Sequence, residues 1–244
     1  MSNNQFSRSI VHQLSAEDAA RIQAQFFNQV FGWMAAGLTF TGGTALFTAA
    51  TPTLVQFVSG SALVYLGLVL VTITVAGFLT NRIFQWSRTQ VQLAFIGYSV
   101  LNGLTLSGVF LHYTSTSIAS TFFTTAIMFG VMSAFGYFTK SDLSGWGKLL
   151  GMVLIGLFAS VVVNIFLHSP GLAFVTSFIG VILFTGLAAY HTQKLKDIAF
   201  LGVTEGEEVH DKASILGALV LYLDFVNLFI FLLRFTGVSA DRRR

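Results

Sequence analysis

A single carboxylate interrupts a long apolar run near the C-terminus, where Asp224 lies within VLYLDFVNLFIFLLR, residues 220–234. A charged side chain in the middle of a membrane costs about 2.5–3.5 kcal/mol on insertion scales, and acids found there often belong to ion paths or proton relays. Such an acid must face a polar interior, have a partner or stay protonated. Asn227 follows three residues later, on the same face of a helix, and extends the polar patch. Asp224 is therefore a candidate functional residue, the alternative being an acid that only fixes helix packing.

Few ionisable residues could pair with Asp224, because the apolar segments contain no other acid and no Lys or Arg away from their ends. His191 is the leading candidate, and Arg82 is the next. Free imidazole titrates near pH ~6.5, so a His–Asp pair could respond to pH near neutrality. If the sixth helix ends at residue 193, His191 lies near the membrane boundary, whereas Asp224 is about 16 Å from either end of its own helix. Contact then requires a tilted helix, a shifted helix end or a bridging water; otherwise His191 is an interfacial histidine.

The elements that must position these residues are membrane helices. Hydrophobic residues make up 54% of the 244 residues and charged residues only 9%, whereas soluble domains carry about 25% charged residues. No Asp, Glu, Lys or Arg occurs in residues 22–81, 89–139 or 149–193. Each tract is long enough for about two crossings of roughly 20 residues. The sequence therefore predicts a polytopic membrane protein and excludes a soluble domain.

The fold class that we predict is an all-α membrane protein, a bundle of seven transmembrane helices. Pro52 and Pro170, with small polar clusters and charged connections, separate the apolar segments. We expect an N-terminal segment over 1–23, a transmembrane domain over 24–237 and a short basic tail over 238–244. The predicted helices cover roughly 24–50, 54–80, 89–111, 117–138, 147–168, 171–193 and 213–234.

The orientation follows from the Lys and Arg residues of the short connections, which favour the cytoplasmic side. Basic residues alternate between connections: the N-terminal segment and the 81–88, 139–148 and 194–212 connections carry them, and the other three carry none. The alternation predicts a cytoplasmic N-terminus. Seven crossings then place the tail GVSADRRR outside, although its three arginines favour the inside, so a re-entrant seventh helix is the alternative.

Other classes of function find little support. The mild net charge of +3, with basic residues at segment ends, argues against a nucleic-acid partner, and the absence of cysteine excludes disulfides and thiolate metal sites. The N-terminus lacks the apolar core of a signal peptide. An aspartyl protease needs two opposed carboxylates, and a retinal protein needs a Schiff-base lysine that the seventh helix lacks. We find no cofactor motif and expect no enzyme.

Several motifs, in the same order, resemble the transmembrane Bax inhibitor motif family, especially its bacterial members. The strongest is SILGALVLYLDFVNLFIFLLRFTG (214–237), followed by GLAAYHTQKLK (186–196) and GYFTKSDLSGWG (136–147). FGWMAAGLTFTG (31–42) and YSVLNGLTLSGVF (98–110) are also similar. The resemblance implies seven helices with a central seventh helix, and in some members a pH-sensitive calcium leak. There, two aspartates on helices six and seven share a proton, and an arginine near the end of helix two interacts with them.

Carried over to this chain, the resemblance places the second aspartate at Asp224 and the arginine at Arg82. The first aspartate belongs to a Tyr-Asp-Thr-Gln pattern, but this chain has His191 between Tyr190 and Thr192-Gln193. Two carboxylates would resist double ionisation, whereas His and Asp attract when both are charged. The exchange also removes one hard oxygen donor of the kind that Ca²⁺ prefers. We therefore expect pH sensitivity, while calcium binding and any metal site stay open.

Two functions remain as hypotheses. The first is a pH-sensitive cation leak, with calcium as a possible ion, in which Asp224, His191 and Arg82 form the gating region and Tyr190, Gln193 and Asn227 are polar neighbours. The second is a non-transporting membrane protein that modulates a partner such as a membrane-bound protease or cell-death machinery. The acidic segment EGEEVHD (205–211) could bind such a partner, but a solvated loop explains it equally well. The bacterial-like motifs predict the inner membrane as the location.

Overall fold

The structure is a computed structural model that describes residues 15–200 and 205–240. Within these residues, seven helices are long and apolar enough to cross a membrane, which confirms the predicted all-helical class with seven spans. The first fourteen residues and the last four, including Arg8 and the terminal arginines of the orientation argument, lie outside the described part. The cytoplasmic N-terminus and the domain limits stay predictions.

The first helix, α2 (Ala16–Ala50), begins eight residues earlier than predicted. Ser15 caps it, because its side chain accepts a hydrogen bond from the backbone N–H of Asp18 at 3.1 Å. The acids Glu17 and Asp18 occupy the first turn, where they complement the positive end of the helix dipole. A polar first turn can thus precede the apolar part of the same helix, which apolar patterning does not reveal.

The predicted second helix, 54–80, is wrong as one continuous element. The structure has α3 (Pro52–Ser59) and α4 (Ala62–Arg82), followed by the 3₁₀ turn η1 (Ile83–Gln85). Gly60 ends α3, and Ser61 is extended at φ −140° and ψ 127°. A Cβ at Gly60 would overlap the Gln56 carbonyl, so the close turn requires glycine there. The second span is consequently Leu63–Gln85.

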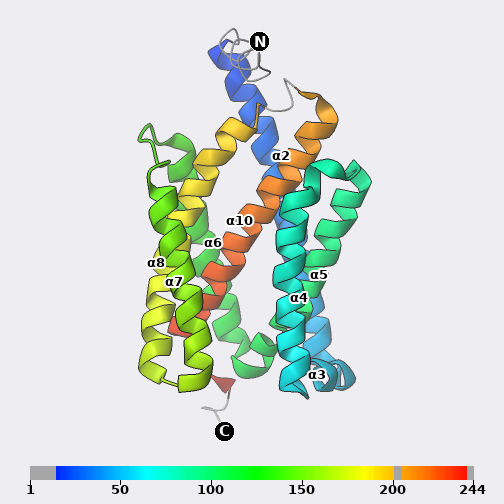
Figure 1. The fold of residues 1–244 in the computed structure, drawn as a ribbon, viewed down its shortest axis with the longest axis vertical. Helices are drawn as coiled ribbons and strands as arrows, with labels where there is room; N and C mark the ends of the chain where they lie inside the picture. Colours follow the sequence, from blue (N-terminus) through cyan, green and yellow to red (C-terminus); the bar gives the residue numbers. More distant parts are fainter. Residues whose placement is uncertain (1–14, 201–204, 241–244) are drawn as a thin grey trace. The chain divides into compact units, whose positions relative to one another are not determined.

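The middle helices agree closely with the prediction. They are α5 (Arg88–His112), α6 (Ser115–Phe138) and α7 (Trp146–Leu167). Ser87 and Gln90 form a reciprocal cap at the start of α5: Ser87 N–H donates to Gln90 Oε1 at 2.9 Å, and Gln90 N–H donates to Ser87 Oγ at 3.4 Å. Helices α4 and α5 run side by side, as do α7 and α8 (Figure 1).

The last two helices are longer than predicted. Helix α8 (Pro170–Ile198) continues five residues beyond 193, and α10 begins at Glu207 and runs to Thr236. The connection predicted over 194–212 is therefore largely helical at both ends. Helix α10 is the most buried span: 67% of its apolar window is buried, against 6% for α7. The central place of the seventh helix, which the family resemblance implies, stays a prediction.

The chain divides into two compact units, each of which is described by itself. The first contains the chain up to Gly108 together with Leu195–Leu219, and the second contains Val109–Lys194 together with the chain from Val220. The core of the first unit includes Phe26, Val30, Phe95, Ile215 and Leu219, and that of the second includes Phe129, Leu183, Phe184, Phe225 and Leu228.

Candidate functional site

His191 and Asp224 form a direct pair in the second unit. His191 Nδ1 lies 2.6 Å from Asp224 Oδ2, within hydrogen-bond distance. The Asp224 side chain is only 5% exposed, whereas that of His191 is 26% exposed. The buried carboxylate thus has a partner with more access to its surroundings. Because the other side chain is an imidazole, this interaction can change with its protonation.

The register between α8 and α10 explains how two residues predicted at different depths meet. Phe184 stacks on Phe231 with ring centroids 5.7 Å apart, and Phe178 contacts Phe235 at 5.9 Å. Residue numbers rise along α8 as they fall along α10 from one ring pair to the next, so the two helices are antiparallel. The same register places His191 of α8 opposite Asp224 of α10. The predicted difference in membrane depth between His191 and Asp224 depended on a sixth helix that ends at residue 193. Helix α8 continues to Ile198, so His191 lies farther from the end of its helix than predicted.

Helix α6 packs beside the pair, against both α8 and α10. A Cβ at Gly136 would overlap the backbone of Ala189, two residues before His191, so α6 and α8 touch through their backbones there. Phe129 of α6 packs edge-on against Phe225, the neighbour of Asp224, with centroids 5.5 Å apart. Close contacts on both helices of the pair limit the positions that the imidazole and the carboxylate can take.

The three predicted polar neighbours have different local roles. Gln193 anchors the connection between α6 and α7: its Oε1 accepts from the Leu143 N–H and its Nε2 donates to the Ser141 carbonyl, both at 2.7 Å. Asn227 donates to the Leu223 carbonyl of its own helix at 2.8 Å. The Tyr190 ring lies where a Cβ at Gly147 would be, so it packs on the start of α7.

Arg82 lies at the end of α4, in the first unit. Its Nη1 donates to Gln85 Oε1 at 2.6 Å, and its guanidinium lies 5.9 Å from the centroid of the Phe78 ring. These contacts are local to its own segment. The pairing of Arg82 with the gating region, which the family resemblance implies, stays a prediction.

A second charged cluster, which the sequence analysis did not assign, lies in the first unit. Arg88 Nη1 is 2.9 Å from Asp211 Oδ2, and Lys212 Nζ is 2.8 Å from Glu208 Oε1. The acidic segment 205–211, expected to be a solvated loop or a docking segment, thus enters α10, and its Asp211 is paired. In the sequence, Arg88 was interpreted only as a topology signal. The opposite charges of Arg88 and of the acids at the start of α10 could have predicted the cluster.

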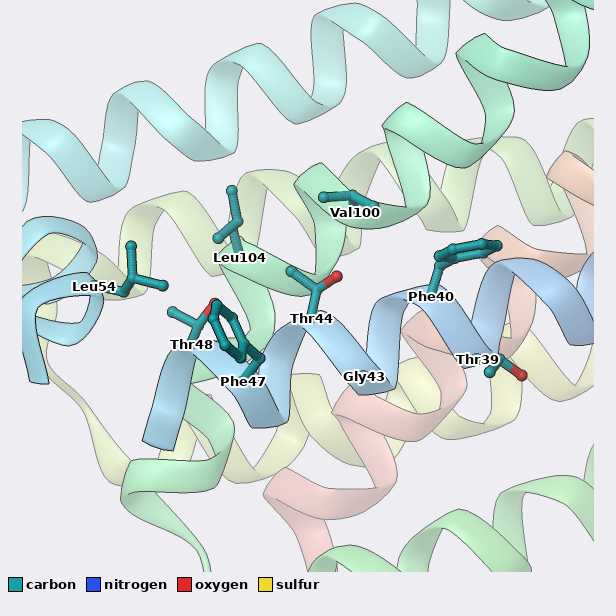
Figure 2. A pocket seen from close by; sticks show the side chains of 9 residues that line it. All are labelled: Thr39, Phe40, Gly43, Thr44, Phe47, Thr48, Leu54, Val100 and Leu104. Atoms are coloured by element: carbon teal, nitrogen blue, oxygen red, sulfur yellow. The ribbon is translucent and has the colours of Figure 1, made fainter. Parts of the chain in front are cut away.

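The described residues also contain an open apolar pocket of about 490 Å³ in the first unit. Figure 2 shows side chains of α2, α3 and α5 around it. Thr48 Oγ1 is buried there without a hydrogen-bond partner among the described residues. The lining contains no ionisable group, so the pocket is not a candidate ion site. Its residues are Thr39, Phe40, Gly43, Thr44, Phe47, Thr48, Leu54, Val100 and Leu104.

Metal-ligating side chains do not gather elsewhere: across residues 15–200 and 205–240, no three His, Cys, Asp or Glu side chains form a cluster that could hold a metal ion. The pair of His191 and Asp224 offers one imidazole and one carboxylate. Ca²⁺ takes six to eight oxygen ligands in typical protein sites. The pair is therefore suited to proton-linked electrostatics, and it is not a complete calcium site.

Comparison with known proteins gives the family. Residues 23–241 match the family model described as inhibitor of apoptosis-promoting Bax1. The inner membrane protein YbhL of Escherichia coli (strain K12) is 44% identical over 212 residues, covering 87% of this chain and 91% of that protein. An uncharacterized protein of Caulobacter vibrioides is 37% identical over 258 residues, covering 98% of this chain and all of that protein.

A further relative supports the same assignment: an uncharacterized protein of Rickettsia prowazekii is 37% identical over 219 residues, covering 89% of this chain and 91% of that protein. The matches cover most of this chain and nearly the whole of each relative. The chain is an integral inner membrane protein like YbhL, and it belongs to the Bax inhibitor family, as its motifs predicted.

Proposed function

We propose that this protein is a pH-sensitive cation leak of the inner membrane, with calcium as the first ion to test. The observation that supports the proposal most directly is the 2.6 Å contact between His191 and the buried Asp224. A membrane protein that only needed stable packing could place an apolar residue at position 224. An ionisable pair between two spans is instead typical of proton-linked transport.

In this proposal the protonation state of His191 sets the opening of the path. At low pH the imidazolium and the carboxylate attract each other, and the pair closes the path. Loss of the imidazole proton removes one charge, so the attraction weakens. The sign of the effect follows: the leak rises as pH rises through the range in which histidine titrates, about pH 6 to 8.

The test is calcium flux into liposomes that contain the purified protein, measured from pH 6 to 8. The native chain is compared with Asp224→Asn, which keeps the size of the side chain and removes its charge. We expect a rise in flux with pH in the native protein and no such rise in Asp224→Asn. Identical flux of the native protein over this range would contradict the mechanism.

The choice of ion is tested in the same liposomes with His191→Asp. This change restores the two-carboxylate arrangement that the family resemblance implies and adds a hard oxygen donor. Calcium flux in the native chain supports calcium as its ion. If only His191→Asp conducts calcium, the native path differs from that of its relatives, and potassium flux is the next measurement.

A second candidate function is the modulation of a partner protein, and the family description, inhibitor of apoptosis-promoting Bax1, favours it. The acidic segment is a weaker docking candidate than the sequence indicated, because Asp211 already pairs with Arg88 and Glu208 with Lys212. A stable co-purifying membrane protein, together with no flux in liposomes, would favour this function over the leak. Neither function requires an enzyme.

A further inference from the structure

The start of α10 is held against the start of α5 by charged groups that the pair of His191 and Asp224 does not use. Arg88 is the first residue of α5, and its Nη1 lies 2.9 Å from Asp211 Oδ2. One turn earlier on α10, Glu208 Oε1 lies 2.8 Å from Lys212 Nζ. Asp211 is therefore the acid of α10 that pairs with α5, and Glu208 pairs within α10.

The cluster is more than a solvated pair at the surface. Exposed ion pairs contribute little, and the Arg88 side chain is 58% exposed. The Asp211 side chain, however, is only 17% exposed, and that of Lys212 only 10%. Lys212 pairs with Glu208 in the favourable order, with the acid four residues before the base. The ion pair of Arg88 and Asp211, which joins α5 to α10, is here named the α5–α10 clamp.

Apolar contacts keep the same part of α10 in register with its neighbours in the first unit. His210 packs edge-on against Phe26 of α2, with ring centroids 5.6 Å apart. A Cβ at Gly217 would contact Leu195 and Val30 at 3.0–3.1 Å, so α10 lies close to both. These contacts are non-directional. The ion pair of Arg88 and Asp211 adds a directional contact between this segment and α5.

We propose that Arg88 is a positioning residue, and that the α5–α10 clamp holds the start of α10 in the conformation in which the path is closed. The inference rests on the proposed function, because it assigns a role to the helix that carries Asp224. Asp211 and Asp224 lie thirteen residues apart on α10, which is a continuous helix from Glu207 to Thr236. A contact that is present in the closed state and lost in the open state shifts the equilibrium toward closure.

The experiment uses charge exchange in the full-length protein. The variants are Arg88→Asp, Asp211→Arg and the double variant that carries both, with Arg21→Asp, an exposed arginine of α2, as the matched control. Two quantities are measured: amide hydrogen exchange of residues 207–212, and cation flux into liposomes at pH 6, where the proposed gate is closed. Hydrogen exchange reports how well the amides of the helix start are protected against local opening, and it does not depend on flux.

Each single exchange is expected to accelerate hydrogen exchange at 207–212 and to raise the flux at pH 6 by about two- to fivefold, the factor expected for loss of a partly exposed ion pair. The double variant should return both quantities toward those of the native protein, and Arg21→Asp should change neither. Rescue by the double variant separates a specific pair from a general loss of stability.

The remaining outcomes overturn the inference at different points. Unchanged hydrogen exchange in Arg88→Asp means that the clamp does not position α10. Faster exchange with unchanged flux, in a preparation where Asp224→Asn has its expected effect, means that the clamp is structural and does not control the gate. Absence of flux in the native protein refutes the proposed function, and the control of the gate by Arg88 with it.

Discussion

His191 and Asp224 meet at 2.6 Å although 33 residues separate them along the chain. The antiparallel packing of α8 on α10 brings them together, and Gly136 allows α6 to approach the same part of α8. The pair is thus a product of three helices. A change in the register of either α8 or α10 would separate the imidazole from the carboxylate.

The pH dependence of the leak should follow the imidazole. His191→Gln keeps a side chain that can donate a hydrogen bond to Asp224, but it removes the titratable group. We expect cation flux in this variant to vary little between about pH 6 and 8, whereas flux in the native protein rises. The measurement is liposome flux at matched protein content. A native-like pH profile in His191→Gln would assign the titration to another group.

A second carboxylate at position 191 should change the chemistry of the site in a defined way. In His191→Asp, two close carboxylates resist double ionisation and tend to hold one proton between them. We expect a pH profile that differs in midpoint from the native one, and a higher ratio of calcium to potassium flux because a negatively charged oxygen donor replaces the imidazole. His191→Asn is the control, since it adds the oxygen without the charge. Equal ion ratios in the two variants would exclude a role for the added charge.

The packing of α6 on α8 should depend on Gly136. Gly136→Ala places a methyl group against the Ala189 backbone, and overpacking of this kind typically costs about 1–3 kcal/mol. Gly130→Ala on the same helix is the matched control, because nothing lies within 4 Å of its Cβ position. We expect Gly136→Ala to lower the temperature of thermal unfolding in detergent and Gly130→Ala to leave it equal or raise it slightly. Similar unfolding temperatures for the two variants would contradict the close contact.

Gln193 should control the order of the connection beside the site. Gln193→Leu removes the two 2.7 Å hydrogen bonds to Leu143 and Ser141, and each backbone group loses its side-chain partner. Faster hydrogen exchange at the Leu143 amide is expected. Gln193→Glu keeps the acceptor for that amide and loses the donor to Ser141, so its Leu143 exchange should stay near native. Identical exchange in Gln193→Leu and the native protein would show that the two bonds do not order the connection.

The parts of the fold that could be predicted are those where long uncharged tracts meet prolines or polar clusters. The helix predicted over 117–138 is observed at Ser115–Phe138, and the one predicted over 147–168 at Trp146–Leu167. The agreement is close because the free energy of transfer into lipid decides the structure of these segments. The break at Gly60 was missed. A membrane helix can be apolar on all sides, so hydrophobic periodicity does not mark a turn between two such helices.

The site was only partly predictable for a related reason. The type of residue identified Asp224 and His191, since an acid in an apolar run needs a partner and few ionisable residues are available. The register that pairs them depends on where α8 and α10 begin and end, and both helices extend into polar sequence. The pairing of Arg88 with Asp211 depends on the same extension, because Asp211 lies in a segment that its composition assigned to a loop.

The orientation of the chain can be tested with single cysteines, because the native sequence contains none. Thr116 and Ser141 are both exposed and lie at opposite ends of α6, at its first turn and beyond its last residue. With a cytoplasmic N-terminus, Thr116→Cys faces the periplasm and Ser141→Cys faces the cytoplasm. A maleimide that cannot cross the inner membrane should therefore label Thr116→Cys in intact cells and Ser141→Cys only after the inner membrane is opened. The reverse pattern would invert the topology, and with it the side from which pH acts on His191; labelling of both in intact cells would show that α6 does not span the membrane.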